Sequence, residues 1–412
     1  MIMKYRHEKG GSIQASNEAL TGLTVLDLTR VLAGPYGTMI LGDFGAQIVK
    51  IEQPGRGDDT RSWGPPFNEY GESAYYLSVN RNKASVALNL KTREGQDVLR
   101  DFVVHADVLI ENFKVGTMAD LGLGYPALRE LNPGLIYCAI TGYGQDGPYA
   151  NRPGYDTVIQ AQGGLMSITG PADGEPFKVG VAIVDITAGL YAVISILAAL
   201  QYRYRTGEGQ FIDIALFDSQ LGWLANVASA YLLTGEAPSR FGNAHATIVP
   251  YQTFTTADGR LMLAVGNDRQ FAALCQVLGH AEWAQDERFH NSPARVNHRQ
   301  ALIVLLTPMF RARRTSEWIE ALLDVGVPCG PVNDVPAALG DPQSAARGMV
   351  QTVPDPRGGH VRLVGPVPKM SATPPAIRTP PPSLGQHTQQ VLREMLGYDD
   401  ARIEQLRANG AI

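Results

Sequence analysis

The chain has 412 residues, more than one small core accommodates, so its length predicts two or three domains or one large domain with an insertion. Hydrophobic residues make up 44% and charged residues 18%, as in ordinary soluble globular proteins. A net charge of −5 argues against nucleic acid as the main partner. The apolar windows fall short of the ~20 uninterrupted residues that span a bilayer, so no membrane partner is expected.

The cysteines and the N-terminus indicate a cytoplasmic protein. Cys138, Cys275 and Cys329 are far apart and form no Cys-x-x-Cys pair, which suggests a reducing compartment without disulfides. Residues 1–19 are polar and lack the apolar core of a secretory signal, so they are interpreted as a tail.

Strands and helices are expected to alternate through the N-terminal half. The strand-like segments are residues 22–28, 45–52, 84–90, 107–111 and 135–140. Helical spacing at 30–41 and 94–104 separates some of them. This alternation favours an α/β fold with a large Rossmann-like parallel sheet, whose ligands bind at the carboxyl ends of the strands.

The pattern changes after about residue 225. Two short strands at 251–254 and 261–265 flank an Asp-Gly turn and predict a hairpin, and residues 269–280, 300–311 and 315–325 have helical spacing. The sequence therefore predicts a tail at 1–19, a large domain at 20–225, a smaller α+β domain at 245–330, and a connector and C-terminal part at 331–412 that returns to the large domain. Within that last part, the Pro-rich stretch 374–382 is typical of an extended connector.

Asp185 is the most informative single residue. It stands between an apolar run of strand character at 178–184 and an apolar stretch of helical character at 186–199. A carboxylate is expensive to desolvate unless it is paired or used, and at a helix N-terminus it can serve as a nucleophile. It can also be a simple N-cap, which is the commoner use of such a residue. Spacing alone therefore leaves both interpretations open.

Common cofactor and metal signatures are missing. The first predicted strand is not followed by Gly-x-Gly-x-x-Gly, and the sequence has no phosphate-binding Gly-Lys-Ser/Thr loop, no paired histidines at metal-binding spacing and no Gly-x-Ser-x-Gly. We expect no metal and no permanently bound cofactor.

Four polar segments are candidates for binding, and each also has a simple structural interpretation. Arg61 in the loop 55–66 can clamp a carboxylate or stand in a solvated loop. The basic cluster at 80–83 can hold phosphates or form a turn. Asn112 and Phe113 can offer an amide and a stacking ring or merely end a strand. The paired glycines Gly163 and Gly164 permit close backbone approach to a ligand, or simply turn the chain.

Taken together, ordered segments between about residue 20 and the C-terminus resemble the family III CoA-transferases. The likeness is carried by residues 25–35, 45–52, 80–83 (Asn-Arg-Asn-Lys), 111–113 (Glu-Asn-Phe), 142–144, 207–210, 326–331 and 384–388. The resemblance implies an interlocked homodimer with acyl-CoA and carboxylic acid substrates. It also implies that Asp185 is the nucleophile and forms an aspartyl-CoA thioester without a metal.

The resemblance also implies binding roles. The positions that match CoA-contacting residues of the family are Arg30, Val31, Ala33, Leu88, Asn112 and Phe113. Backbone N–H groups near Gly163 and Gly164 are expected to hold each oxyanion. Gln53 and Asp120 replace arginines that lie near the nucleotide in a family member, formyl-CoA transferase. That leaves Arg30, Arg81, Lys83 and Arg152 as unranked candidates for the CoA phosphates.

Within the family, two features narrow the activity. Tyr155 replaces a histidine that serves proton transfer in the racemase branch, and a phenol with a pKa near 10 is a poor base at pH 7. The segment 242–252, with His245, replaces a glycine-rich loop. Together with 57–67 and 75–83, it is most similar to the branch that moves CoA from succinyl-CoA to glutarate. Arg61 or Arg81 is then expected to bind the distal carboxylate.

Three alternatives stay open. The first is a racemase or epimerase that acts at the α-carbon of an acyl-CoA. The second is a transferase for another carboxylate pair, such as formate and oxalate, carnitine or citramalate. The third is a non-catalytic CoA-binding relative, against which the intact motif at Asp185 argues.

Overall fold

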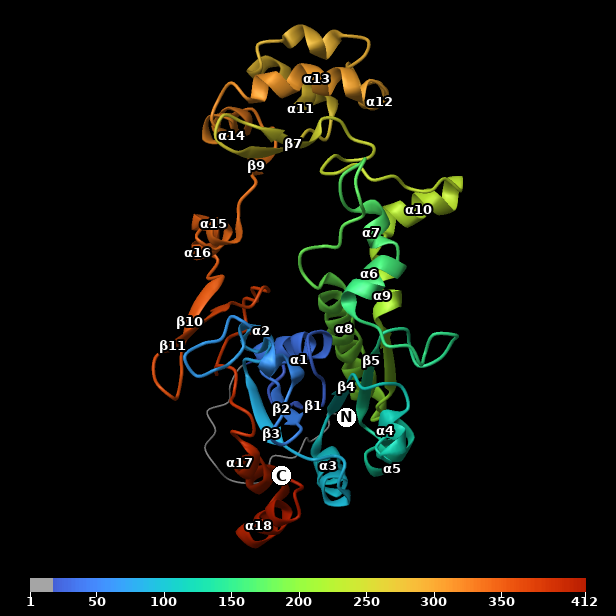
Figure 1. The fold of residues 1–412 in the computed structure, drawn as a ribbon, viewed down its shortest axis with the longest axis vertical. Coiled ribbons are helices and arrows are strands. Elements are labelled where there is room, and N and C mark those ends of the chain that lie inside the picture. The colour runs from blue at the N-terminus through green and yellow to red at the C-terminus, as the bar shows by residue number, and fades with distance from the viewer. Residues whose placement is uncertain (1–17) are drawn as a thin grey trace. The chain divides into compact units, whose positions relative to one another are not determined.

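The computed structural model describes residues 18–412, and the chain forms two compact units, drawn in Figure 1. The first, here called the sheet unit, comprises the described residues 18–163 together with 181–223 and 346–412. The second, here called the hairpin unit, comprises 164–180 and 224–345. The predicted tail, residues 1–19, lies almost wholly outside the described residues.

A six-stranded sheet in the order β3-β2-β1-β4-β5-β6 forms the centre of the sheet unit. Its strands are β1 (Thr24–Asp27), β2 (Gln47–Glu52), β3 (Lys83–Ala87), β4 (Val108–Glu111), β5 (Ile136–Thr141) and β6 (Phe211–Ala215). Every neighbouring pair is parallel. The predicted α/β fold and parallel sheet are thereby confirmed, and β6 is a strand that the sequence analysis did not identify.

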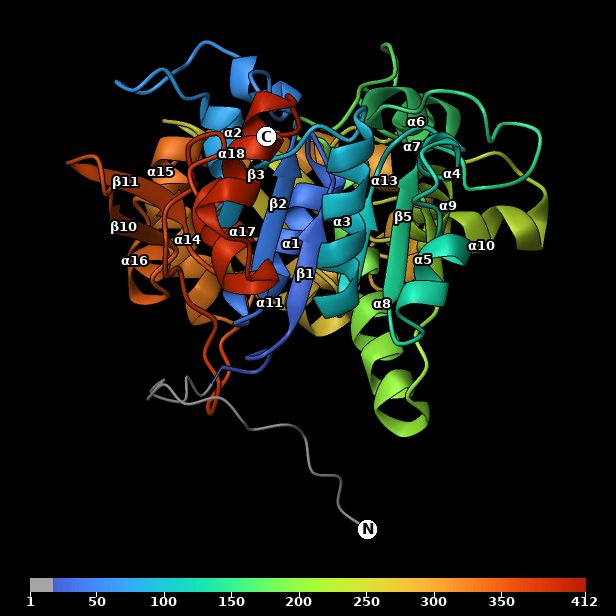
Figure 2. The same cartoon turned by 90° about the horizontal axis from the view of Figure 1, so that it is seen from below.

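Helices cover both faces of this sheet because its strands are apolar on both sides. Val25 packs into the core beneath α1 (Ala33–Asp43) and α8 (Ile183–Thr206), whereas its neighbour Leu26 packs into the core on the opposite face. That second face is covered by α3 (Arg93–His105), α5 (Tyr125–Leu131), α17 (Thr388–Leu396) and α18 (Asp400–Ala408). Figure 2 shows α3 and α17 in front of the sheet.

The remaining elements of the sheet unit are short. They are η1 (Asp59–Ser62), α2 (Ala74–Val79), α4 (Thr117–Asp120), α6 (Asp156–Gln162), α9 (Leu216–Trp223) and the antiparallel pair β10 (Val350–Pro354) and β11 (His360–Val364). The Pro-rich residues 374–382 form neither helix nor strand. They are held to the unit by backbone bonds such as that from Ala376 N–H to the Asp43 carbonyl (3.0 Å).

The hairpin unit contains the predicted hairpin, β7 (Tyr251–Thr255) and β8 (Arg260–Ala264), to which β9 (Cys329–Pro331) adds a third strand. The hairpin turn is closed by a bond from Thr256 N–H to the Gly259 carbonyl. The helical elements of the unit are α7 (Leu165–Ile168), α10 (Ala225–Thr234), α11 (Asp268–Val277), η2 (Ala281–Gln285), α12 (Ser292–Asn297), α13 (Arg299–Phe310), α14 (Thr315–Asp324), α15 (Val335–Leu339) and α16 (Pro342–Ala346, whose last residue falls in the sheet unit).

The expectation of a strand at 178–184 is wrong. The residues before 183 have no regular structure, and α8 begins at Ile183. The N–H groups of Val184 and Asp185 donate to the carboxylate of Asp156, so a side chain from another element caps the helix at this point. Asp185 therefore lies in the first turn of α8, and it is not an N-cap.

α8 is the long apolar helix on which the site depends. Its 24 residues and mean hydropathy of 2.1 would satisfy the length and composition of a membrane span. In this fold, however, one face of the helix packs on the sheet and crosses α1 at close range. A Cβ atom at Gly189 would lie 2.5 Å from the Ala33 carbonyl oxygen, so glycine is required at this crossing.

We predict that Gly189→Ala lowers stability by about 1–3 kcal/mol, because the added methyl group forces α1 and α8 apart. Gly222→Ala is the matched control: it lies in α9, and its Cβ would meet only the Tyr191 hydroxyl at an ordinary 3.5 Å. Its stability should be unchanged or raised by up to about 1 kcal/mol. Thermal and urea unfolding of the three proteins measures both effects, and equal stability of the two variants would contradict the close crossing.

Candidate active site

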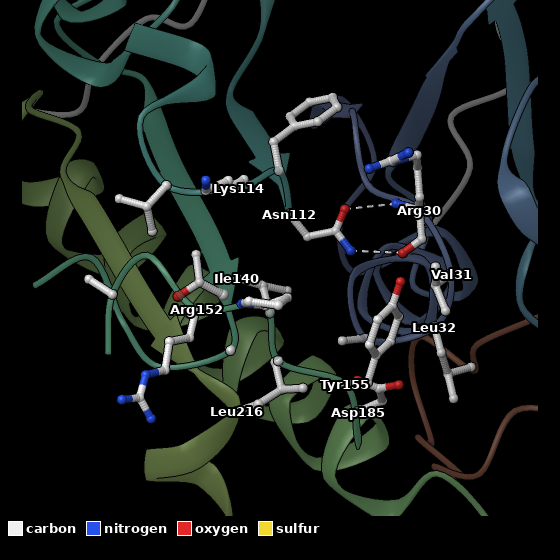
Figure 3. A pocket seen from close by; sticks show the side chains of 18 of the residues that line it. Arg30, Val31, Leu32, Asn112, Lys114, Ile140, Arg152, Tyr155, Asp185 and Leu216 are labelled. Atoms are coloured by element: carbon white, nitrogen blue, oxygen red, sulfur yellow. Dashed lines mark hydrogen bonds between the residues drawn. The ribbon is translucent and has the colours of Figure 1, made fainter. Parts of the chain in front are cut away.

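A cavity of about 440 Å³ lies at the carboxyl edge of the parallel sheet, within the sheet unit. Its wall is built from the turn after β1, the ends of β4 and β5, residues 150–155 and the start of α8. The predicted site residues that line it are Arg30, Val31, Ala33, Asn112, Phe113, Tyr155 and Asp185. Figure 3 shows most of them around the cavity, with Arg30, Val31, Asn112, Tyr155 and Asp185 labelled.

A second cavity, of about 420 Å³, adjoins the first and shares Arg30 and Phe113 with it. Leu88, the remaining predicted CoA contact, lies here. The apolar part of the wall comprises Leu28, Ile51, Leu88, Leu90, Phe113 and Leu121, and cationic side chains come from Lys50, Arg56 and Lys91. Lys50 is wholly buried and paired with Asp58, so it is not available to a ligand. The shared Arg30 and the largely exposed Arg56 both pair with Asp59, and Lys91 also lines this wall.

Asp185 is placed by the cap that Asp156 provides. Asp156 is the first residue of α6 and is 7% exposed. Its Oδ2 accepts the N–H of Val184 at 2.8 Å and of Asp185 at 3.3 Å, while Gln160 donates to its Oδ1 at 2.6 Å. Burial, followed by the negative charge of Asp156, raises the pKa of Asp185 to about 7.

A second group near Asp185 escaped the sequence analysis. Burial, followed by the carboxylates of Asp185 and Asp156, raises the pKa of Tyr75 to about 12. Tyr75 lies on α2 beside the apolar cluster of Leu32 and Met39, and its ring meets that of Trp63 edge-on, with centroids 5.3 Å apart. Its phenol is neutral at pH 7, so it adds no charge near Asp185.

The turn between β1 and α1 is fixed by side chains from other elements. The Asn112 amide accepts from Arg30 N–H at 2.9 Å and donates to the Arg30 carbonyl at 2.8 Å, as the dashed lines in Figure 3 show. Asp58 Oδ1 accepts from Val31 N–H at 3.2 Å. Asn112 therefore stabilises the backbone of this turn. The neighbouring Phe113 lines both cavities.

The expected roles of the two arginines find no support in the structure. The nitrogens of Arg61 are bound to Glu52 (2.7 Å), Tyr76 and the Pro382 carbonyl, and those of Arg81 to Asp43 and the Val364 carbonyl. Neither arginine lines the cavity of Asp185. Their positive charges are neutralised inside the fold, so neither is free for a distal carboxylate.

The basic candidates for the CoA phosphates fall into two groups, those buried in ion pairs and those that line a cavity. Lys83 is wholly buried against Asp27, and Arg81 is internal as described, whereas Arg30 and Arg152 line the first cavity. Lys114, which the sequence analysis did not single out, lines it too. Gln53 lies in the wall of the second cavity, where Arg56 supplies a charge.

Three further predicted residues lie outside this wall. Gly163 ends α6, and a Cβ there would lie 2.4 Å from Gln220 Cγ, so close packing explains the glycine. Gly164 begins α7 with φ +86°. His245 belongs to the hairpin unit, where its Nδ1 accepts from Thr247 N–H at 3.1 Å. Neither glycine lines the cavity of Asp185, which leaves their expected oxyanion role unsupported.

Comparison with known proteins identifies the class. The chain matches CoA-transferase family III over residues 20–388. It is 44% identical over 397 residues to the succinyl-CoA:glutarate CoA-transferase of Mus musculus, covering 96% of this chain and 91% of that protein. It is 46% identical to the succinate–glutarate CoA-transferase of Agrobacterium fabrum, covering 91% and 95%. A CAIB/BAIF family protein from Brucella suis has a similar structure, with a TM-score of 0.83, 46% identity and coverage of 92% and 100%.

The chain therefore belongs to CoA-transferase family III, and it is an enzyme that transfers coenzyme A. The CoA thioester is a substrate rather than a resident cofactor. Within residues 18–412, no group of three or more His, Cys, Asp or Glu side chains is arranged to hold a metal ion.

We predict a pH effect from the Asp156–Asp185 pair. The resemblance implies that Asp185 is the nucleophile, and only an ionised carboxylate can attack a thioester, so kcat/KM should rise with pH through about 7. Asp156→Asn keeps an oxygen for the helix N–H groups and removes the charge that raises the pKa of Asp185. The acidic limb should therefore move to lower pH.

The measurement is the initial rate of CoA transfer from pH 5 to 9. Asp218→Asn is the control, because Asp218 also lies in the first turn of a helix but lines neither cavity. An active Asp156→Asn variant with an unmoved acidic limb would show that Asp156 does not influence the ionisation of Asp185.

Proposed function

We propose that the enzyme moves CoA from succinyl-CoA to glutarate through a covalent intermediate on Asp185. The observation that carries this proposal is the Asp185 carboxylate, which shares one cavity with five residues that match CoA-contacting positions. The donor and acceptor follow from the two relatives reported above, whose names pair succinyl-CoA or succinate with glutarate.

On the side of the protein the chemistry needs only this carboxylate, and the two reactants are a thioester and a carboxylic acid. An Asp185 oxygen attacks the succinyl-CoA carbonyl, the C–S bond breaks, and CoA leaves as a thiolate from a succinyl-aspartyl anhydride. The thiolate attacks the aspartyl carbonyl, which releases succinate and leaves an aspartyl-CoA thioester. Glutarate attacks this thioester to give a glutaryl-aspartyl anhydride and thiolate. The thiolate then takes the glutaryl group, which regenerates Asp185.

The two cavities suit the two ends of CoA. The apolar wall of the second cavity suits the adenine ring, and Arg56 and Lys91 supply charge for the phosphates beside it. Arg30 lies where the cavities join, with its guanidinium 5.5 Å from the centre of the Phe113 ring. The pantetheine arm would then run from Arg30 along the first cavity to Asp185.

The oxyanions need hydrogen-bond donors near Asp185, and we assign them to the start of α1. Ala33 is the first residue of that helix and lines the cavity, and the first N–H groups of a helix have no intrahelical acceptor. The paired glycines at 163 and 164 do not line this wall. The start of α1 therefore replaces them in the proposal.

The racemase alternative is disfavoured by the composition of the wall. Racemisation requires proton acceptors on both sides of the α-carbon. The ionisable side chains with suitable acidity that line the first cavity are Asp185 and Asp59, and Asp59 is paired with Arg30 and Arg56. No histidine of residues 18–412 lines it.

The test is mass spectrometry of the protein after brief incubation with succinyl-CoA and rapid quenching, with and without hydroxylamine trapping. We expect an adduct on Asp185 that is absent from Asp185→Asn, and at least a 1,000-fold loss of transfer in that variant, because no other carboxylate takes its place. Glutarate, oxalate, carnitine and citramalate are offered as acceptors. CoA appearing on oxalate but not on glutarate would contradict the proposed acceptor, and absence of any adduct or exchange would contradict the covalent mechanism.

We also propose that the enzyme is a homodimer. α8 presents a row of exposed apolar side chains, Leu190, Tyr191, Ile194 and Leu197, which follow helical spacing on one face. In α10, Leu232 and Leu233 are 81% and 87% exposed. Apolar rows of this kind are normally covered by another protein surface, and a second copy of this chain agrees with the interlocked dimer that the resemblance implies.

We predict that Ile194→Glu weakens the dimer, because it places a charge in the middle of the α8 row. Val104→Glu is the matched control: Val104 is also an exposed apolar residue, but it lies on α3. Sedimentation velocity over a range of concentrations should show a monomer-dimer equilibrium for the first variant and a stable dimer for the second. A monomeric wild-type protein would rule out the dimer.

A further inference from the structure

We infer that the buried pair Lys50–Asp58 is a positioning device for the transfer reaction, because it holds Val31 in a left-handed backbone conformation that shapes the wall facing Asp185. This inference rests on the proposed function, since it concerns where the thioester lies relative to the attacking carboxylate. Both residues lie outside the predicted set of site residues.

The starting observation is the backbone of Val31. Its φ is +70°, a region that β-branched residues rarely adopt because Cβ approaches the carbonyl oxygen. Val31 is not at a remote loop tip, because Val31, Leu32 and Ala33 all line the cavity that contains Asp185. A strained conformation persists only where the surrounding structure imposes it, and such residues cluster at functional sites.

The strain is imposed by a set of side-chain bonds to three successive residues. Lys50 Nζ donates to the Thr29 carbonyl at 2.8 Å, and Asp58 Oδ1 accepts from Val31 N–H at 3.2 Å. Between them, Asn112 holds both polar groups of the Arg30 backbone. The turn is therefore fixed from β2, from the loop after β2 and from the end of β4.

Lys50 and Asp58 tie these contacts together. Lys50 Nζ and Asp58 Oδ2 are 3.0 Å apart, and both side chains are 0% exposed. Burial opposes ionisation of Asp58, but the Lys50 ammonium and the bonds from Thr60 outweigh it and lower the pKa of Asp58. The pair is therefore charged, and a charged acceptor holds the Val31 N–H more strongly than a neutral one.

A buried ion pair is weak evidence for stability as such, because desolvation offsets much of the attraction. Its geometric effect is clearer. If Val31 relaxed to negative φ, the chain from Val31 to Ala33 would turn away from its present course, and the first turn of α1 would shift against Asp185. A misplacement of about 1 Å between reacting groups can cost about 100-fold in rate.

The experiment is a cycle of three variants: Asp58→Asn, Val31→Gly and the double variant. Asp58→Asn should lower kcat about 100-fold with a smaller change in KM for succinyl-CoA. Val31→Gly alone removes a side chain from the proposed CoA-binding wall and should raise KM for succinyl-CoA, but it should lower kcat less than Asp58→Asn does, because Asp58 still holds the turn. Glycine adopts positive φ without strain, so the double variant should regain at least about 10-fold of the lost kcat.

Asp107→Asn is the matched control. Asp107 also accepts a backbone N–H (Thr24, 2.8 Å) and pairs with a cation (Arg203, 2.8 Å), but it lies at the amino edge of the sheet. This variant should lose stability without losing kcat. Adding Val31→Gly to it should not raise kcat. If Asp58→Asn does not fold, Asn112→Ala loosens the same turn from a half-buried position and should be rescued in the same way.

Two results would overturn the inference: full activity of Asp58→Asn, or a loss that Val31→Gly does not recover. Either result is distinct from failure of the proposed function, in which the wild-type enzyme transfers no CoA from succinyl-CoA to any acid. In that case, CoA binding by calorimetry still tests the turn, since Asp58→Asn is expected to weaken CoA binding by the same smaller factor as it changes KM.

Discussion

The close crossing of α1 and α8 is the contact on which the site depends. Gly189 lies against the Ala33 carbonyl and Gly37, so the two helices approach as closely as their backbones allow. Both helices begin at the carboxyl edge of the sheet. Their first turns therefore meet there, and α1 contributes the cavity wall while α8 contributes Asp185. A side chain at position 189 would separate Asp185, the nucleophile that we propose, from the wall that we assign to the oxyanions.

Among the described residues, the absence of a cationic partner distinguishes Asp185, the proposed nucleophile, from the other buried carboxylates near this edge of the sheet. Asp27, Glu52 and Asp58 are buried near the same edge of the sheet, and each has a cationic partner, respectively Lys83, Arg61 and Lys50. Asp185 forms no ion pair within residues 18–412, and its nearest charged neighbour is a second carboxylate, Asp156. A carboxylate without a cation keeps its lone pairs available for attack, and its raised pKa makes it more nucleophilic once ionised.

Local pattern was enough to predict the framework but not the pairing of charges. The parallel strands, the hairpin and the placement of Asp185 near a helix start follow from periodicity, and five CoA-contact positions meet around one cavity as the resemblance implies. The expected role of Arg61 and Arg81 finds no support in their contacts, because their partners, Glu52 and Asp43, lie 9 and 38 positions away, and a sequence does not show which side chain a guanidinium reaches. Asp156 was missed for the same reason, since it caps a helix that begins 27 positions later.

Two features of the site raise the free energy of the folded state, the strained backbone of Val31 and the repulsion between Asp156 and Asp185. Neither is favourable in isolation, and relaxing either would move a group that faces the cavity. Val31 is held by Asp58, and Asp156 is held by the N–H groups at the start of α8 and by Gln160. The side chains that provide these bonds, Asp58, Asp156 and Gln160, do not line the cavity of Asp185. The wall can therefore present a fixed geometry to a long, flexible thioester. In the mechanism that we propose, the enzyme then need not reorganise at any of the four steps in which the same thiolate leaves and returns.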